Sequence, residues 1–209
     1  PYELVDREDI RGPVQTFVNA PTSLRQVYED AASDVEFVVA EDQRWTFAEF
    51  WNDAATIGHL LVHDLGVRKG DRVAISMRNY PEWILSYWAI LSVGATVVGM
   101  NAWWTGPEML YALEDSTPKA IIADEERLAT LNSIRAKLAN LVVIGVRVPG
   151  SPADVTPWSD VIADPTPMPE IAIDPDSDAC IFYTSGTTGN PKGAQLTHRG
   201  CTTNIWSLM

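Results

Sequence analysis

The sequence predicts an α/β fold in which a doubly wound, mostly parallel sheet carries helices on both faces. Three observations support this prediction. Between residues 71 and 146, short apolar runs alternate with longer segments whose apolar side chains have helical spacing. The links between these segments are short. The apolar runs are nearly continuous, as in parallel strands that are covered on both faces.

The residues before this unit predict helices and one hairpin. Thr22 or Ser23 has the residue type that caps a helix, and apolar residues follow at helical spacing. A later stretch places Phe50, Ile57 and Leu61 on one helical face. The elements predicted there are a helix over 22–32, a strand over 36–40 that returns over 44–46, and an amphipathic helix over 46–65.

The alternating unit itself predicts four strands, with a helix between each strand and the next. The four strands should be parallel and lie in one sheet, with the right-handed crossovers that are nearly obligatory for such units. The strands are predicted over 71–77, 95–100, 119–124 and 141–146, and the helices over 81–93, 107–114 and 125–139.

Residues 149–178 differ in composition from the rest of the chain. They hold seven of the fourteen prolines and seven acids, with no Lys or Arg. Such a stretch predicts an irregular surface connection, with at most a short helix over 158–163. The predicted organisation is a segment of a second, incomplete subdomain (1–65), a parallel α/β unit (66–148), this connection (149–178), and a strand, loop, strand and helix start (179–209).

Composition and charge exclude several classes of function. The formal net charge is -13, which repels nucleic acid and anionic membranes at long range. No segment approaches the ~18 apolar residues of a membrane span, and the acidic start is not a secretory signal. Cys180 and Cys201 lie 21 residues apart and favour buried thiols over a disulfide. These features together predict a cytoplasmic protein.

The most distinctive stretch of the sequence is YTSGTTGNPKG, residues 183–193. It is not a Walker loop, because Lys192 precedes a glycine instead of following one. It also lacks the dinucleotide pattern G-x-G-x-x-G. The nucleophile elbow G-x-S-x-G would need glycine where Tyr183 and Thr187 stand, so Ser185 is not an elbow nucleophile.

The residue types of this loop nevertheless favour phosphate binding. Glycines let successive backbone N–H groups converge on an anion, and Lys192 adds a full positive charge. The alternative is a hairpin rich in Ser, Thr and Gly that binds no ligand. The candidate ligand-binding residues are Thr184, Ser185, Gly186, Thr187, Thr188, Gly189 and Lys192.

The order of these residues resembles a known family. YTSGTTGNPKGAQLTH, residues 183–198, is similar to the phosphate-loop signature of the adenylate-forming enzymes, which include acyl-CoA synthetases and coumarate–CoA ligases. The resemblance extends upstream through RWTFAEF, LGVRKGDRVAISMRNYPEW, GATVVGMN and EMLYALEDSTPKAIIADE. The first twenty residues carry little of the pattern.

The resemblance implies an AMP-binding and ATP-binding ligase. In such enzymes a carboxylate attacks the α-phosphorus of Mg-ATP, and a thiol, usually that of coenzyme A, then takes the acyl group. On this reading Thr184 to Gly189 cradle the β- and γ-phosphates, and Lys192 balances their charge during catalysis. His198 matches the family position after the loop, where we expect local hydrogen bonding. The upstream segments look most like the fatty acyl-CoA synthetase branch.

The resemblance also implies that parts of the enzyme are missing. The family's magnesium-binding motif, its adenine-binding and acid-binding residues and its C-terminal domain all follow the loop. We therefore expect a truncated N-terminal portion of the large adenylate-forming domain, inactive alone, with most Mg²⁺ ligands outside this chain. An apolar surface exposed on the helices over 22–32 and 46–65 would allow a homo-oligomer. The alternative function is a truncated, non-catalytic module that binds a nucleotide or a partner.

Two further features favour structural interpretations. His59 and His63 have the spacing of metal ligands on a helix, but the zinc-peptidase pattern would need Glu at position 60, which is Leu. We expect both on a solvated helix surface, and no metal site is predicted. Trp103 and Trp104 follow a predicted strand, and a half-buried pair in a loop is favoured over a contact with a partner.

Overall fold

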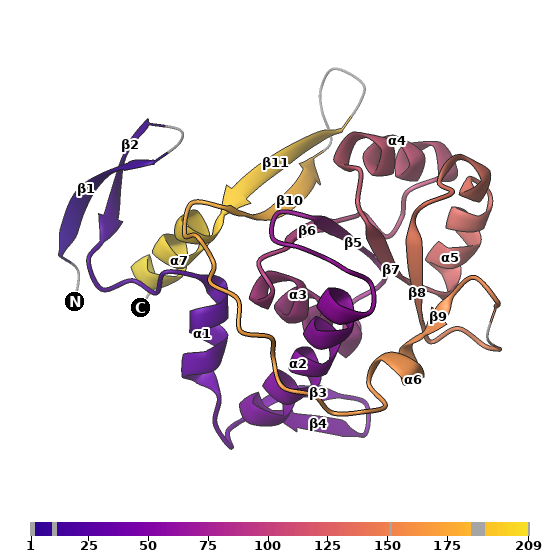
Figure 1. Cartoon of the computed structure of the whole chain (residues 1–209), viewed down its shortest axis with the longest axis horizontal. Coiled ribbons are helices and arrows are strands. Elements are labelled where there is room, and N and C mark those ends of the chain that lie inside the picture. Colours follow the sequence, from indigo (N-terminus) through magenta and orange to yellow (C-terminus); the bar gives the residue numbers. More distant parts are fainter. Residues whose placement is uncertain (1–2, 10–11, 151, 185–190, 209) are drawn as a thin grey trace.

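The computed structural model describes residues 3–9, 12–150, 152–184 and 191–208. Its centre is a seven-stranded sheet with the order β11-β10-β6-β5-β7-β8-β9 (Figure 1). All neighbouring strands are parallel except β10 and β11, which are antiparallel. The strands are β5 (Arg72–Ser76), β6 (Thr96–Gly99), β7 (Ala120–Asp124), β8 (Val142–Val146), β9 (Thr156–Pro157), β10 (Asp178–Thr184) and β11 (Lys192–Thr197). The predicted doubly wound, mostly parallel sheet is confirmed.

Helices cover both faces of this sheet, as predicted. The side chains of β5 alternate between two separate cores: Val73 and Ile75 pack on one face, and Ala74 packs on the other. The first core holds helices α1 (Leu24–Ala31), α2 (Phe47–His63) and α3 (Pro81–Ser92), and the second holds α4 (Gly106–Ser116) and α5 (Glu125–Asn132).

Local capping explains where the helices begin. Thr46 and Glu49 form a reciprocal capping box at the start of α2, and Thr105 and Glu108 form another at the start of α4. The Asp124 side chain accepts a hydrogen bond from the backbone N–H of Arg127 and caps α5. These caps satisfy backbone donors that have no partner within the helix.

The end of α5 and the N-terminal hairpin differ from the sequence prediction. Helix α5 ends at Asn132 and a 3-10 turn follows over Arg135–Lys137, although the spacing predicted a helix to residue 139. The Ser133 hydroxyl donates to the Thr130 carbonyl at 2.6 Å, which competes with helical hydrogen bonding. A hairpin of β1 (Leu4–Asp9) and β2 (Gly12–Phe17) forms where no element was predicted, and it packs beside α7 (His198–Ser207).

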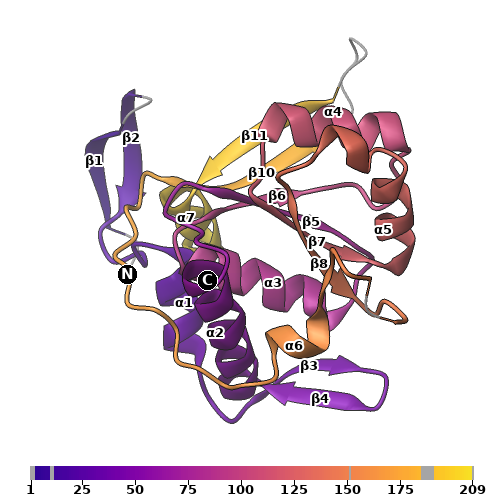
Figure 2. The same ribbon diagram turned by 45° about the vertical axis from the view of Figure 1, so that its right-hand side comes forward.

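The connection over 149–178 runs along the α2 side of the molecule (Figure 2). It contains the short helix α6 (Trp158–Val161), close to the predicted position, and the two-residue strand β9, which was not predicted. The backbone N–H of Thr166 donates to the Thr56 hydroxyl of α2 at 3.2 Å. The Arg25 guanidinium of α1 donates to the Pro169 carbonyl at 2.7 Å. This segment is therefore tied to the helices that it crosses.

The apolar faces of α1 and α2 are covered. Phe50, Ile57 and Leu61 are fully buried, and Tyr28 stacks on Trp88 with ring centroids 4.3 Å apart. The expectation of exposed apolar surface on these helices is wrong for their main apolar residues, because α3 packs against both helices and the connection over 149–178 crosses them. A second hairpin, β3 (Glu36–Ala40) and β4 (Gln43–Thr46), packs Phe37, Val38 and Trp45 against the first core. The division of the chain into four segments stays a prediction.

Candidate phosphate-binding site

The candidate loop follows the end of β10. Because β10 is parallel to β6, Thr184 lies at the carboxyl edge of the parallel strands. Ligands of open α/β sheets bind outside this edge. Of the predicted site residues, only Thr184 and Lys192 are described. The others, Ser185, Gly186, Thr187, Thr188 and Gly189, lie outside the described residues.

Thr184 and Lys192 face each other as the last pair of the β10–β11 ladder. The Thr184 hydroxyl donates to the Lys192 carbonyl at 3.4 Å, and both residues are exposed. No carboxylate among the described residues forms an ion pair with the Lys192 ammonium group. Lys192 is also the only Lys or Arg between Arg147 and Arg199. Its charge is therefore available to an anion held at this end of the hairpin.

Gly193 allows close packing at the base of the loop. A Cβ at Gly193 would lie 2.8 Å from Ile181 Cγ2 and 3.3 Å from Tyr183 Cζ. A side chain at this position would therefore force its neighbours to move. Gly193 is the register partner of Tyr183, so this close packing occurs one pair before the strands end at the loop.

Tyr183 anchors the end of β10 to α4. Its hydroxyl donates to Asp115 Oδ2 at 2.7 Å, and its ring meets Trp104 edge to face with centroids 5.7 Å apart. Burial and the hydrogen bond to Asp115 raise the pKa of the Tyr183 hydroxyl. The phenol therefore stays protonated and keeps donating at neutral pH.

A cluster missed by the sequence analysis lies at the same carboxyl edge. Asp124 at the end of β7 accepts from the backbone N–H of Arg78 at 3.0 Å and pairs with Arg127 at 3.2 Å. The guanidinium groups of Arg78 and Arg127 lie 4.7 Å and 5.7 Å from the centre of the Trp103 ring. Trp103 is 74% exposed, so the prediction of a half-buried pair is wrong for it and fits only the intermediate burial of Trp104.

The reason for this exposure is local. The backbone N–H of Trp103 donates to Asn101 Oδ1 at 2.9 Å, which forms a tight turn before α4. The Trp103 ring lies on the outer surface, near the partly exposed Arg78 guanidinium and the buried Arg127 guanidinium, instead of in the second core. The sequence could have indicated this cluster, because a charged or aromatic residue stands at or just after the carboxyl end of each of the three strands β5, β6 and β7.

His198 lies in the core and does not contact Thr184 or Lys192. It is fully buried, and its Nδ1 accepts the backbone N–H of Leu24 at 3.3 Å. Its Nε2 has no hydrogen-bond partner in the described part of the chain. Burial lowers the pKa of His198 to about 4, so the imidazole is neutral at neutral pH. The hydrogen bond that His198 makes thus joins it to a residue 174 positions away in the chain.

The other histidines lie on α2 with ring centroids 4.2 Å apart. His63 is exposed and His59 is half-buried. Within the described residues, no three His, Cys, Asp or Glu side chains are grouped so that they could hold a metal ion. None of the described helices has the length and apolar character that crossing a membrane would require.

Comparison with known proteins gives matches to one family model and to CoA ligases. A family model described as AMP-binding enzyme matches residues 25–209. A crotonobetaine/carnitine–CoA ligase of Salmonella paratyphi A is 30% identical over 190 residues, which cover 84% of this chain and 36% of the ligase. 4-Coumarate–CoA ligase 2 of Petroselinum crispum is 30% identical over 145 residues, covering 69% of this chain and 26% of that ligase.

Solved structures agree with these relatives. The crystal structure of an anthranilate CoA ligase in complex with anthranoyl-AMP matches with a TM-score of 0.79 and 28% identity, over 85% of this chain and 35% of that one. The fatty acyl CoA synthetase of Mycobacterium tuberculosis matches with a TM-score of 0.70 and 26% identity, over the same shares.

The chain thus spans 36% and 26% of the lengths of the two curated relatives named above. The match to the AMP-binding family covers the whole parallel sheet, the candidate loop and the helix that follows. On the strength of this match over residues 25–209, the chain belongs to the family of AMP-binding enzymes.

Proposed function

We propose that this chain supplies the loop that holds the β- and γ-phosphates of ATP in a ligase that joins a carboxylic acid to coenzyme A. The observation that carries the proposal is the placement of Thr184 and Lys192. They end the hairpin at the carboxyl edge of the sheet, both exposed, and no described carboxylate neutralises the lysine. A hydroxyl donor and an available cation at this edge fit a phosphate anion.

The proposed reaction has two steps. A substrate carboxylate attacks the α-phosphorus of ATP, pyrophosphate leaves, and the acyl-adenylate then passes its acyl group to the thiol of coenzyme A. Negative charge develops on the departing pyrophosphate, so donors already fixed there stabilise the transition state. In this scheme Thr184 to Gly189 donate to the β- and γ-phosphates and Lys192 balances their charge. Bound Mg²⁺ would neutralise part of the phosphate charge, with most of its ligands outside this chain.

We further propose a fatty acid as the acid substrate and the cytoplasm as the location. The relatives differ in their acids, since their names include carnitine, coumarate, anthranilate and fatty acyl groups. The Mycobacterium tuberculosis synthetase favours the fatty acyl choice, and the carnitine and coumarate ligases favour other acids.

Association of identical copies of the chain also stays a proposal. The apolar surface first expected on α1 and α2 does not support it, because the main apolar residues of these helices are buried.

Titration of the chain with Mg-ATP tests the phosphate role of the loop. The loop can offer a few charge-assisted hydrogen bonds, each worth roughly 1.5–3 kcal/mol, against an association cost of at least about 4 kcal/mol. We expect a dissociation constant of about 1 mM, measured by phosphorus NMR. Lys192→Ala should weaken binding about tenfold, which corresponds to about 1.4 kcal/mol.

Lys137→Ala is the matched control, because Lys137 is an exposed lysine in the 3-10 turn and makes the same change in net charge. Equal weakening in both variants would indicate non-specific attraction to ATP and contradict the proposed role of Lys192. Pyrophosphate release with a panel of fatty acids should be absent for the chain alone. Acid-dependent release would show that the chain holds a complete site.

A further inference from the structure

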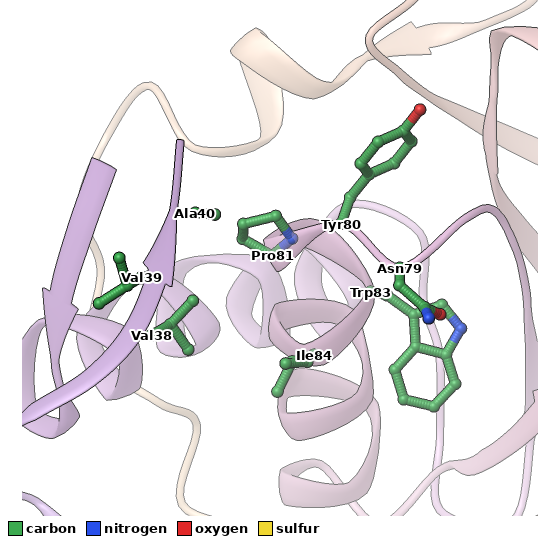
Figure 3. Close-up of a pocket in the computed structure, with 8 residues that line it drawn as sticks. All are labelled: Val38, Val39, Ala40, Asn79, Tyr80, Pro81, Trp83 and Ile84. Carbon is green, nitrogen blue, oxygen red and sulfur yellow. The ribbon is translucent and has the colours of Figure 1, made fainter. Parts of the chain in front are cut away.

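A pocket of about 290 Å³ lies between the edge of β3 and the start of α3 (Figure 3). The strand contributes residues 38–40 and the helix start contributes residues 79–84. Figures 1 and 2 both place the β3–β4 hairpin at the opposite end of the molecule from the end of β10. The pocket is therefore separate from the candidate phosphate site.

The lining of this pocket is mostly apolar, and its polar side-chain groups are the Asn79 amide, the Tyr80 hydroxyl and the Trp83 indole N–H. Its residues are Val38, Val39, Ala40, Asn79, Tyr80, Pro81, Trp83 and Ile84. Val38 and Ile84 stand on the two sides of the gap in Figure 3. Val39 is 51% exposed, which leaves apolar surface uncovered at the mouth. No described residue forms a hydrogen bond with the side-chain amide of Asn79, so this amide can bind a ligand.

Charges at the rim disfavour an anionic ligand. The Arg147 guanidinium lies 4.1 Å above the Tyr80 ring, but Glu82 holds it with two contacts of 2.9 Å and 3.3 Å. The hydrogen bonds to Glu82 raise the pKa of Arg147 further. Glu41 and Asp42 form the exposed turn of the β3–β4 hairpin, whose strand β3 lines the pocket.

Arg44, the register partner of Val39, is paired with Glu36 at 2.8 Å, and Arg78, next to Asn79 in the chain, is paired with Glu126 at 3.2 Å. An anionic ligand would therefore have to compete with the carboxylates that already hold these cations.

The backbone at the rim is held in an uncommon conformation. Arg147 has a φ of 55°, in the left-handed region that residues other than glycine rarely adopt. Such a conformation persists only where the surroundings enforce it. The Arg147 guanidinium lies over the Tyr80 ring and so covers one face of it.

Volume sets the size of the occupant. An apolar cavity of about 150 Å³ in another protein binds benzene. A pocket of about 290 Å³ is large enough for a fused bicyclic ring. We propose that it binds a neutral, planar aromatic compound of bicyclic size, with one ring N–H that donates to the Asn79 amide oxygen. Tyr80 and Trp83 supply aromatic surface for the ring, and Val38 and Ile84 supply aliphatic contacts.

Indole is the probe, and amide chemical shifts of the full chain are the measurement. We expect saturable shifts at residues 38–40 and 79–84, with a dissociation constant on the order of 1 mM or tighter. Indole-3-acetate, which adds a carboxylate to the same ring, should bind at least about tenfold more weakly. Absence of saturable shifts, or equal binding of the two probes, would overturn the proposal.

Ala40→Trp fills the pocket and should abolish the shifts. Val35→Trp is the matched control, because Val35 is 63% exposed and does not line the pocket. If Ala40→Trp fails to fold, Asn79→Ala gives a second test: it should weaken indole several-fold and leave naphthalene, which has no N–H, unchanged. Equal effects on both compounds would refute the assigned role of Asn79. Indole binding should persist in Lys192→Ala, so this test is independent of the proposed ATP site.

Discussion

Gly99 of β6 lies directly opposite Phe182 of β10, and the aromatic ring covers the glycine. The two residues are register partners in the parallel pair, and a Cβ added at Gly99 would lie 2.6 Å from Phe182 Cε1. Any residue other than glycine at position 99 would therefore force the Phe182 ring to move. Because β10 leads into the candidate loop, this contact helps to fix where the loop begins.

Gly99→Ala should lower the free energy of unfolding by about 1–3 kcal/mol, because overpacking of a close contact costs this much. Urea denaturation measures the effect. Adding Phe182→Leu should recover part of the loss, since a smaller side chain makes room for the new methyl group. Gly200→Ala in α7 is the control, because its added Cβ would meet only Thr197 Oγ1 at 3.3 Å. A Gly99→Ala variant as stable as the Gly200→Ala variant would contradict the packing argument.

The buried pair of Asp124 and Arg127 gives a second prediction. Their side chains are 5% and 6% exposed, and each has further partners at the carboxyl edge of the sheet. Arg127→Leu should destabilise the chain by about 3–5 kcal/mol, because Asp124 is left buried without its cation. Adding Asp124→Asn should restore part of the stability. Denaturation of the single and double variants forms the cycle that tests the coupling.

Glu126 provides the contrast for this cycle. Its carboxylate contacts both Arg78 and Arg127, but its side chain is 65% exposed. Glu126→Ala should therefore cost no more than about 1 kcal/mol, as exposed ion pairs do. A loss for Glu126→Ala as large as that for Arg127→Leu would show that burial does not decide the energetics of the cluster.

A third prediction concerns the start of α2. Thr46 accepts the backbone N–H of Glu49 and donates to the Glu49 carboxylate at 2.9 Å. Thr46→Ala removes both bonds and should cost about 1 kcal/mol in unfolding free energy, whereas Thr46→Ser should cost little. Thermal denaturation of the two variants separates the hydroxyl from the methyl group. A loss of the same size in Thr46→Ser would assign the effect to the methyl group instead.

The strands of the parallel sheet could be predicted from the sequence because both of their faces are buried. Apolar side chains then follow one another without interruption, as in Val73, Ala74 and Ile75. The β1–β2 hairpin gave no such signal. Its apolar residues do not form a continuous run, and it is held by backbone hydrogen bonds and by contacts such as that of Gln15 with Asp6 at 3.0 Å. Local sequence patterns do not encode contacts of this kind.

The candidate site divides in the same way. The loop was recognisable because its residues are contiguous, although most of them lie outside the described residues. The cluster of Arg78, Trp103 and Asp124 was not recognised, because its members follow three different strands. The Arg78–Asp124 bond joins residues 46 positions apart. Only the order of β6, β5 and β7 in the sheet brings them together.

The burial of His198 leads to the last prediction, a loss of stability in mild acid. The pKa of His198 is lowered from 6.5 to about 4 in the folded chain, because burial disfavours the imidazolium. Between these values the unfolded chain takes up a proton that the folded chain does not. The contribution of His198 to stability is therefore complete above pH 6.5, falls as the pH decreases, and reaches its full loss near pH 4.

His198→Asn isolates this effect. The Asn side-chain oxygen can accept the backbone N–H of Leu24 in place of Nδ1, but it does not titrate in this range. Between about pH 7 and about pH 5, the native chain should lose about 2 kcal/mol more unfolding free energy than the variant, because one pKa unit corresponds to about 1.4 kcal/mol. Any cavity left by the smaller side chain is the same at both pH values, so it cancels in this comparison. His63→Asn, at an exposed position of α2, should keep the full acid loss of the native chain. If His198→Asn and the native chain lose stability in parallel, His198 is not the group that titrates.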